Sequence, residues 1–509
     1  MRPTRRAVLG WTAGLAACAE APPPEPLPPP DPWARPTNGK KPLSLLVILC
    51  DDLRADVLGC AGHRVAKTPN IDRLAREGHS FDRAFVTTSL CGPSRATLWT
   101  GHYAHRHGIL HNEADLPESA ATWPKMLQSA GYHTAFIGKW HLGSASAAPR
   151  PGWDHWVGFR GQGQYVYPGP ERLAPIDRSF NVDGTLQRMN GYVTDLLTDA
   201  GVRAIRSAPA DKPFAVVVSH KAVHAPFVPA ERHLGAYADV AGPSPLANTD
   251  AAYEGRPQWI RRMREGEFSA DAPYSGRWPD LGAWYRDYLR TLLAVDEGVG
   301  KLLDALAEAG RLEDTVVLFT SDNGFMAGER GVVDKRNFYE ESIRIPWILR
   351  GPPVARPGSR CTSMVLNLDW MPTLLDAAGL VPPEDGDGVT VLPLVGDQPP
   401  PGRTEWLYEY FFEPAFPQTP TVLGVRTATH KFVHYHGVWE RNELFDLAND
   451  PGEVANLIDD PAHADRVRGM SGRLRRLAAR HGLSLEPRWD RPAEEPPVEG
   501  GESAPTGAE

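Results

Sequence analysis

One cysteine lies where a helix end would place it beside a positive charge. Residues 89–95 read Ser-Leu-Cys-Gly-Pro-Ser-Arg, and Pro93 suits the first turn of a helix. We therefore expect Cys91 at or just before the helix N-terminus, where free N–H groups and the helix dipole favour an anion. Arg95 follows one turn later on the same face. The pattern predicts a nucleophile, an anion-attracting helix end and a fixed cation in one turn.

Two pairs of oxygen-bearing side chains each follow an apolar run. Asp51 and Asp52 follow one run, and Asp322 and Asn323 follow another. Each pair alone is typical of a turn or a helix cap. Together, behind two similar strands, these carboxylate and amide oxygens favour a site for Ca²⁺ or Mg²⁺ and do not suit zinc.

Apolar runs without alternation predict strands that are buried on both faces, which is the pattern of a parallel sheet covered by helices. Four such runs cover residues 45–50, 134–137, 214–218 and 316–320. Polar residues follow each run directly. Because ligands of open α/β sheets bind beyond the carboxyl ends of the strands, these polar clusters can converge. Residues 345–350 predict a fifth strand of the same sheet.

Helical spacing of apolar residues fills the intervals between the strands. Covering helices are predicted at residues 70–77, 193–207 and 284–309. The stretch 226–282 is charged and rich in turn residues, so we expect it to run over the sheet outside the core.

The pattern changes beyond about residue 380. Short alternating runs at 421–426, 431–435 and 444–447 predict a small antiparallel sheet, and residues 466–480 predict one amphipathic helix. The expected fold is therefore α/β, with a large mixed, mostly parallel sheet flanked by helices and a smaller C-terminal antiparallel-sheet subdomain.

The first residues indicate export. The Arg5-Arg6 pair resembles a twin-arginine signal, and the following apolar stretch is too short to span a bilayer. Residues 15–18 resemble a lipobox, in which Cys18 would be lipidated; the alternative is a plain cleaved signal with an incidental cysteine. We expect an exported bacterial protein, periplasmic or held at the outer membrane or cell surface as a lipoprotein.

Composition suggests how the chain is divided. The predicted parts are an export signal at 1–20, a Pro-rich linker at 21–41, a catalytic domain at 42–380, a C-terminal subdomain at 381–485 and a disordered tail at 486–509.

The 509 residues carry a net charge of −9 without a Lys/Arg-rich block, which excludes a nucleic-acid binder. Apart from Cys18, the four cysteines show no paired spacing, so neither a disulfide framework nor a zinc site is expected.

The Cys91-x-Pro93-x-Arg95 motif, followed by Thr100-Gly101, resembles the signature of the type I, formylglycine-dependent sulfatases of the alkaline phosphatase superfamily. Further blocks resemble this family in the same order, at residues 51–52, 68–72, 138–143, 322–324 and 339–342. The resemblance covers roughly residues 43–460 and implies a sulfuric ester hydrolase with an alkaline-phosphatase-like fold.

The resemblance also implies a modified nucleophile and a metal ion. In this family a maturation enzyme oxidises the cysteine that matches Cys91 to Cα-formylglycine. The aldehyde is hydrated to a gem-diol, one hydroxyl attacks the sulfur of a sulfate ester, and the second hydroxyl then expels the sulfate. One Ca²⁺ ion is implied, with ligands that match Asp51, Asp52, Cys91, Asp322 and Asn323.

Catalytic roles follow from the matching positions. Arg95 matches the residue that holds the attacking hydroxyl, and His141 matches the residue that contacts the formylglycine hydroxyl. Lys139 and His224 match the positions that stabilise or protonate the leaving oxygen, and Lys335 matches a distal sulfate-binding lysine. Each would supply charge where the transition state is most anionic.

Residues 219–227 and 334–336 resemble the branch that includes N-acetylglucosamine-6-sulfatase-like and mucin-desulfating enzymes. This resemblance implies a sulfated carbohydrate substrate, such as N-acetylglucosamine 6-sulfate or a related glycan unit. Because the net charge of −9 repels a polyanion at long range, we expect an enzyme that admits one terminal sugar into a pocket.

Several alternatives remain open at this stage. The same groups would hold a phosphoryl group, so a phosphate or phosphonate ester hydrolase of the superfamily is one alternative. A non-catalytic glycan-binding protein with unmodified Cys91 is another. Among the histidines, His105 is a candidate for a position near the site. Trp153, Trp156 and Tyr165 would form either a sugar platform or ordinary packing.

Overall fold

The computed structural model describes residues 31–143, 146–167, 179–241, 255–265, 281–436 and 441–484. The predicted export signal, the lipobox and the tail at 486–509 lie outside these ranges, as does the linker up to residue 30.

Ten strands form one mixed sheet in the order β12-β2-β11-β10-β1-β9-β3-β4-β6-β7. They are β1 (Ser44–Cys50), β2 (His79–Phe85), β3 (His133–Lys139), β4 (His155–Phe159), β6 (Ser179–Val182), β7 (Thr185–Arg188), β9 (Phe214–Ser219), β10 (Thr315–Ser321), β11 (Trp347–Arg350) and β12 (Ser359–Leu366). Strands β10, β1, β9, β3 and β4 run parallel, whereas β11 is antiparallel to both of its neighbours. The predicted mostly parallel sheet is confirmed, and the four predicted runs are its adjacent strands β10, β1, β9 and β3.

The register aligns the ends of these central strands. Cys50 of β1 lies opposite Ser321 of β10, and Leu49 of β1 lies opposite Ser219 of β9. Because the strands are parallel, the polar residues that follow them leave the sheet at the same edge.

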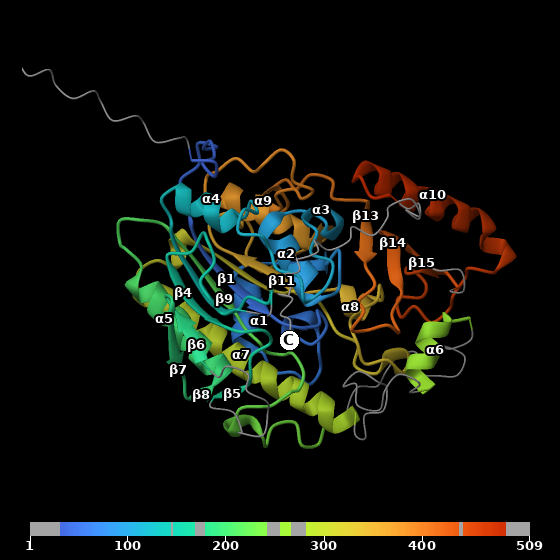
Figure 1. Ribbon diagram of the computed structural model, residues 1–509, viewed down its shortest axis with the longest axis horizontal. Helices are drawn as coiled ribbons and strands as arrows, with labels where there is room; N and C mark the ends of the chain where they lie inside the picture. Colours follow the sequence, from blue (N-terminus) through green and yellow to red (C-terminus); the bar gives the residue numbers. More distant parts are fainter. Residues whose placement is uncertain are drawn as a thin grey trace, which may run out of the picture.

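Helices cover both faces of the sheet (Figure 1). One face carries α1 (Pro69–Glu77), α5 (Val193–Ser207) and α7 (Leu281–Glu308), and the other carries α2 (Cys91–Thr100), α4 (Trp123–Ser129) and α9 (Trp370–Ala377). Strand β1 serves both cores, because Leu46 and Ile48 pack toward the first set of helices while Leu45 and Val47 pack toward the second. The remaining helices are α3 (Ala104–His107), α6 (Gln258–Glu265), α8 (Glu340–Ile343) and α10 (Ala464–Arg480). Within the described ranges no helix has both the length and the apolar character needed to cross a membrane.

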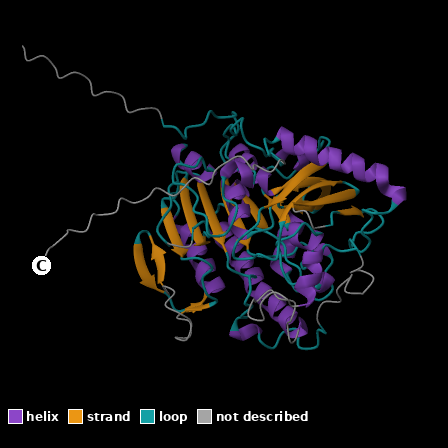
Figure 2. Cartoon of the chain, turned by 45° about the vertical axis from the view of Figure 1, so that its right-hand side comes forward, coloured by secondary structure: helices purple, strands orange, loops and turns teal. Residues whose placement is uncertain are grey.

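A second, antiparallel sheet lies beside the large one (Figure 2). Its strands are β13 (Glu405–Tyr410), β14 (Thr421–Thr427), β15 (His430–His436) and β16 (Glu443–Asp446). Helix α10 covers it with the buried side chains of Met470, Leu474 and Leu477. The rings of Phe338 and Tyr408 stack at 4.2 Å between the large body and β13, so one core joins the two sheets. The expected small C-terminal sheet is confirmed, and β13 is a strand that the sequence analysis missed.

Strands β2, β4, β6, β7 and β12 were also not predicted. Strand β2 reads His-Ser-Phe-Asp-Arg-Ala-Phe and β7 is exposed along its length, so neither has the continuous apolar run that marks a central strand. The short ribbon of β5 (Val166–Tyr167) and β8 (Gly191–Tyr192) is separate from both sheets. Of the predicted excursion at 226–282, the described parts contribute helix α6, the first residues of α7 and no strand. The expectation that this stretch lies outside the core is wrong at α6, because Trp259, Ile260 and Met263 are buried in the hydrophobic core.

An aromatic cluster packs against β3 and includes two tryptophans that the sequence analysis considered for sugar binding. The rings of Trp99 and Trp140 stack at 5.1 Å, and those of Phe136 and Trp156 stack at 4.6 Å. Trp153 and Trp156 are only 8% and 2% exposed. The packing alternative is therefore confirmed for these two residues, and neither offers a face to a sugar.

This assignment predicts a stability effect. Replacement Trp156→Ala should lower the free energy of unfolding by about 3–5 kcal/mol, because it removes a large buried ring and leaves a cavity. The control Leu186→Ala, at a side chain 57% exposed on β7, should change it by less than about 0.5 kcal/mol. Urea unfolding followed by circular dichroism measures both. An equal, small effect of the two replacements would contradict the core assignment.

Candidate active site

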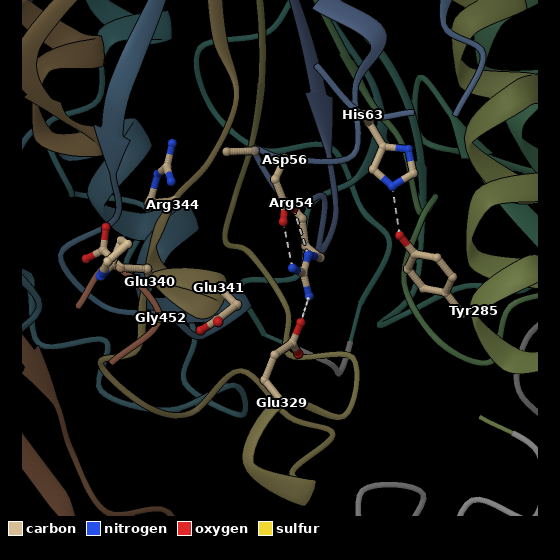
Figure 3. A pocket seen from close by; sticks show the side chains of 11 residues that line it. Arg54, Asp56, His63, Tyr285, Glu329, Glu340, Glu341, Arg344 and Gly452 are labelled. Atoms are coloured by element: carbon tan, nitrogen blue, oxygen red, sulfur yellow. Dashed lines mark hydrogen bonds and ion pairs between the residues drawn. The ribbon is translucent and has the colours of Figure 1, made fainter. Parts of the chain in front are cut away.

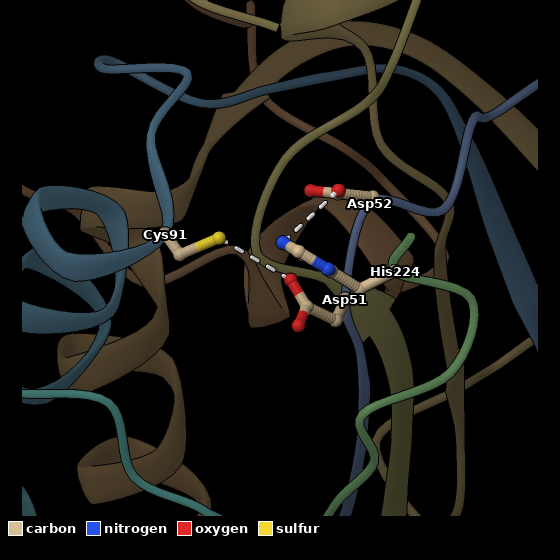
Figure 4. A group of neighbouring side chains, drawn as sticks. All are labelled: Asp51, Asp52, Cys91 and His224. Atoms are coloured by element: carbon tan, nitrogen blue, oxygen red, sulfur yellow. Dashed lines mark hydrogen bonds and ion pairs between the residues drawn. The ribbon is translucent and has the colours of Figure 1, made fainter. Parts of the chain in front are cut away.

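The polar segments that follow the central strands meet at the N-terminus of α2. Asp51 and Asp52 follow β1, His224 comes from the loop after β9, and Cys91 is the first residue of α2; Figure 4 shows their side chains pointing toward one another. One ligand atom from each of these four residues lies within 4.8 Å of the other three. None of the four residues is more than 6% exposed. The fold thus builds a buried group of potential metal ligands around the predicted nucleophile.

Three buried cations pair with three buried carboxylates around this group. The pairs are Lys139 with Asp51, Lys335 with Asp52 at 2.5 Å, and Arg95 with Asp322 at 2.8 Å. Arg95 also donates to the backbone carbonyl of Lys139 at 2.7 Å, so α2 and the end of β3 are tied together. All six side chains are at most 1% exposed, and pairing of this kind is what makes buried charges tolerable.

The three carboxylates do not share the same electrostatic environment. Burial alone would raise the pKa of Asp51, but Lys139 and the neighbouring cations outweigh it and hold that pKa well below its usual value. Burial raises the pKa of Asp52, and burial together with the charge of Asp51 raises the pKa of Asp322 to about 6. Additional positive charge would therefore stabilise the ionised forms of Asp52 and Asp322.

Cys91 is held between a carboxylate and an ammonium group. Its Sγ donates to Oδ1 of Asp51 at 3.3 Å and lies 2.8 Å from Nζ of Lys335. Burial, and after it the charge of Asp51, raises the pKa of the Cys91 thiol. The anion that we expected at this helix end is thus disfavoured for the unmodified side chain. Because the thiolate is the nucleophilic form of cysteine, an unmodified Cys91 is poorly suited to attack.

The oxygen atoms near Cys91 fit a hard divalent cation. Oδ2 of Asp52 and Oδ1 of Asn323 are buried and accept no hydrogen bond within the described part of the chain. Nδ2 of Asn323 donates to the other Asp52 oxygen at 2.6 Å, which fixes the two side chains together. Asp322 is engaged differently, since its oxygens accept from Arg95 and from the backbone N–H of Asp52 at 3.2 Å. Buried carboxylate and amide oxygens with spare acceptor capacity match the donor set of Ca²⁺ or Mg²⁺.

One histidine, His224, belongs to this group, and a second, His141, borders it. Nδ1 of His224 donates to the carbonyl of Ala225 at 2.5 Å, which directs Nε2 toward Asp52 Oδ2 at 3.7 Å. Burial, and after it the charge of Lys139, lowers the pKa of His141 well below its usual value, so its imidazole is neutral. Nε2 of His141 lies 3.1 Å from the amide nitrogen of Gln162, a residue that the sequence analysis did not identify.

Backbone strain accompanies the site. Asp52 and His141 adopt left-handed conformations, with φ of 60° and 52°, which non-glycine residues rarely occupy. Each is the second residue after a strand, since β1 ends at Cys50 and β3 ends at Lys139. Strained residues of this kind cluster at functional sites.

The sequence analysis also singled out His105 and Tyr165, and the structure places these two side chains differently. The ring of His105 bonds to Glu409 at 2.7 Å and to the carbonyl of His481 at 2.8 Å, so this histidine joins the body to the C-terminal elements and is not part of the group. Tyr165 is 3% exposed, and its hydroxyl donates to the carbonyl of His224 at 2.8 Å. Tyr165 therefore holds the backbone of the loop that carries His224.

A cavity of about 380 Å³ lies elsewhere, between the body and the C-terminal elements (Figure 3). Part of the charge on its walls is paired within the protein: Arg54 pairs with Glu329 at 2.6 Å and with Asp56 at 2.7 Å. His63 in turn bonds to the hydroxyl of Tyr285 at 3.0 Å. None of its lining residues belongs to the group around Cys91.

The mixed sheet and the buried carboxylate, cysteine and histidine group at its strand ends define a hydrolase of the alkaline phosphatase superfamily. Residues 44–380 match the family described as Sulfatase, and residues 328–480 match the C-terminal family of N-sulphoglucosamine sulphohydrolase. The chain belongs to the sulfatase family and is a sulfuric ester hydrolase.

Three relatives illustrate the range of this family. The N-acetylglucosamine-6-O-sulfatase of Bacteroides thetaiotaomicron is 32% identical over 490 residues, which cover 85% of each chain. The choline-sulfatase of Rhizobium meliloti is 28% identical and covers 84% of each chain. A solved structure of a complex with the substrate D-glucosamine-2-N,6-O-disulfate has a TM-score of 0.79 at 30% identity, covering 87% of this chain and 98% of that one. Substrates therefore differ within the family, and membership alone does not define the substrate.

The donor set predicts binding of one divalent cation. Replacement Asp52→Asn, which keeps the volume but removes the charge, should lower the affinity for Ca²⁺ by at least about 10–100-fold. It should also abolish the rise in melting temperature on Ca²⁺ addition, since an ion that binds only the folded state stabilises it. Metal analysis of the purified protein and thermal unfolding with and without chelator measure these effects.

The control is Asp56→Asn, which removes a carboxylate four residues away that pairs with Arg54. This variant should keep wild-type metal content. Wild-type metal content in Asp52→Asn would rule out Asp52 as a ligand.

Proposed function

We propose that this sulfatase removes the 6-sulfate of a glucosamine unit, either N-acetylated or N-sulfated. The similarity that carries this proposal extends along most of both chains for the N-acetylglucosamine-6-O-sulfatase, and it includes a TM-score of 0.79 with the disulfated glucosamine complex. No other relative described above combines at least 30% identity with a named glycan substrate.

We also propose that Cys91 is the precursor of Cα-formylglycine and that the cation is Ca²⁺. A buried thiol with a raised pKa argues against direct attack by cysteine sulfur, and oxygen donors such as Asp51, Asp52 and Asn323 favour Ca²⁺. When present, the formylglycine supplies an oxygen nucleophile as its hydrate, and the cation supplies positive charge to the sulfate. The maturation enzyme that acts on Cys91 is then a necessary partner.

The side chains of this protein would bind the anion and move the proton. Each of the three ion pairs has no net charge, so together they offer no excess positive charge to an anionic sulfate ester. The cation would provide that positive charge. Lys139 and Lys335 then hold the sulfate oxygens as rigid, desolvated donors. Burial lowers the pKa of His224, whose Nδ1 is committed to Ala225, so the negative charge of the bound ester is needed to favour the protonated imidazole, which then donates its Nε2 proton to the leaving oxygen.

A phosphate or phosphonate ester hydrolase remains the runner-up, because the same charges would bind a phosphoryl group. No contact of the described residues favours it. The non-catalytic glycan-binding alternative is set aside, because the family membership makes the chain an enzyme.

We also propose where the enzyme acts and which part of a glycan it desulfates. The Arg5-Arg6 signal supports action outside the cytoplasm, and lipidation of Cys18 would tether the enzyme to a membrane. A net charge of −9 supports action on a terminal sugar, since it disfavours approach to a long polyanion.

Parallel assays of sulfate release test the substrate. N-acetylglucosamine 6-sulfate and glucosamine 2-N,6-O-disulfate should be desulfated, with little turnover of 2-, 3- or 4-sulfated sugars or of a 6-phosphate. Cys91→Ala should lower kcat/KM by at least about a thousandfold, because it removes the nucleophile precursor.

The matched control is Cys361→Ala, at a half-buried cysteine outside the site, which should retain activity. Faster release of phosphate than of sulfate from the same sugar would support the runner-up. Wild-type turnover by Cys91→Ala would remove this cysteine from the mechanism.

A further inference from the structure

Lys221 is a buried ammonium group at the border of the site. Its side chain is 3% exposed, and its Nζ lies over the ring of Tyr165 at 5.2 Å from the ring centroid. The charges of Lys139, Asp51 and Asp52 act on it, so it lies within electrostatic range of the group around Cys91. Within the described ranges Nζ of Lys221 has no hydrogen bond and no ion pair.

This lack of an anionic partner separates Lys221 from the other cations of the site. Arg95, Lys139 and Lys335 each pair with a carboxylate. The ring of Tyr165 offers Lys221 a cation–π contact, which is weaker than a salt bridge in a buried site. An ammonium group buried without a counter-charge is unfavourable, and a bound anion would remove that penalty.

The position of Lys221 is fixed by the backbone of the site. Two backbone hydrogen bonds join the residues after Lys221 to Asp51. The N–H of Val223 donates to the Asp51 carbonyl at 2.8 Å, and the N–H of Asp51 donates to the Ala222 carbonyl at 3.0 Å. The N–H of His224 donates to the Lys221 carbonyl at 3.0 Å and closes the turn. Tyr165 contacts both ends of this turn, through its ring and through its hydroxyl. Lys221 therefore lies beside His224, the residue assigned to the leaving oxygen.

We propose that Lys221 binds a second sulfate carried by the same glucosamine unit and so makes the enzyme select disulfated over monosulfated sugar. This inference rests on the proposed function, because the leaving-oxygen side of the site is where the sugar lies. The scissile sulfate would already be surrounded by Lys139, Lys335 and the cation, whereas an anion beside Lys221 would meet the one ammonium group of the site that the described residues leave without a counter-charge. Lys221 is thus a specificity-determining residue and takes no part in bond cleavage.

The test compares two 6-sulfated glucosamines that differ in the group on the C2 nitrogen, which is a negatively charged sulfate in one and a neutral acetyl in the other. Wild-type protein, Lys221→Met and Lys221→Arg are assayed for sulfate release from glucosamine 2-N,6-O-disulfate and from N-acetylglucosamine 6-sulfate. Lys221→Met should lower kcat/KM for the disulfate by about 10–100-fold, chiefly through KM, since it loses one charge-assisted hydrogen bond. For the monosulfate the change should stay below about threefold, and Lys221→Arg should restore most of the preference.

Lys212→Met, at an exposed lysine outside the site, is the matched control, and Lys221→Gln is a second uncharged variant if the methionine protein does not fold. Equal loss on the two substrates would mean that Lys221 binds the scissile sulfate, and it would overturn the inference while leaving the proposed substrate intact. Unchanged kinetics on both would overturn it as well. A wild-type enzyme that desulfates neither ester would contradict the proposed substrate and this inference together.

Discussion

Three carboxylates and three cations lie buried at one edge of the sheet, and none of these six side chains is stable there without its partner. Removing one partner from a buried pair typically destabilises a protein by about 3–5 kcal/mol, because the other charge is left without solvent or counter-charge. The strands that end just before Asp51 and Asp322, the end of β3 and the first turn of α2 must therefore keep their relative positions. The parallel register of β10, β1, β9 and β3 meets this requirement, since it sends all their carboxyl ends to the same edge.

The C-terminal sheet also supports the site. The hydroxyl of Tyr408 on β13 donates to the carbonyl of Asn337 at 2.8 Å, and the hydroxyl of Ser89, two residues before Cys91, donates to the same carbonyl at 2.7 Å. Arg336, next to Lys335, pairs with Glu413 at 2.7 Å. The loop that carries Lys335 is thus held between the nucleophile segment and the smaller sheet. The two family matches overlap over residues 328–380, and this overlap includes that loop.

Local patterns in the sequence predicted the elements that are strongly periodic and the motifs that lie next to them. The four central strands, helix α5 and the position of Cys91 before Arg95 are all visible as runs or spacings of neighbouring residues. Strand β2 and the loop that places Gln162 against His141 have no such signal, because tertiary pairing determines them. The left-handed backbone at Asp52 was equally hidden, since nothing in an Asp-Asp pair marks a positive φ. Burial, which raises the pKa of Cys91, depends on the whole fold and was beyond the sequence pattern.

Conversion of Cys91 is the proposal on which the chemistry depends, because burial and the charge of Asp51 disfavour the thiolate, which is the nucleophilic form of the unmodified side chain. Its most direct test is mass spectrometry of the peptide that contains residue 91, taken from enzyme whose specific activity has been measured. Conversion to formylglycine predicts a loss of about 18 Da relative to the cysteine peptide, in a fraction that rises in proportion to activity. Fully active enzyme whose peptide carries only unmodified cysteine would contradict it.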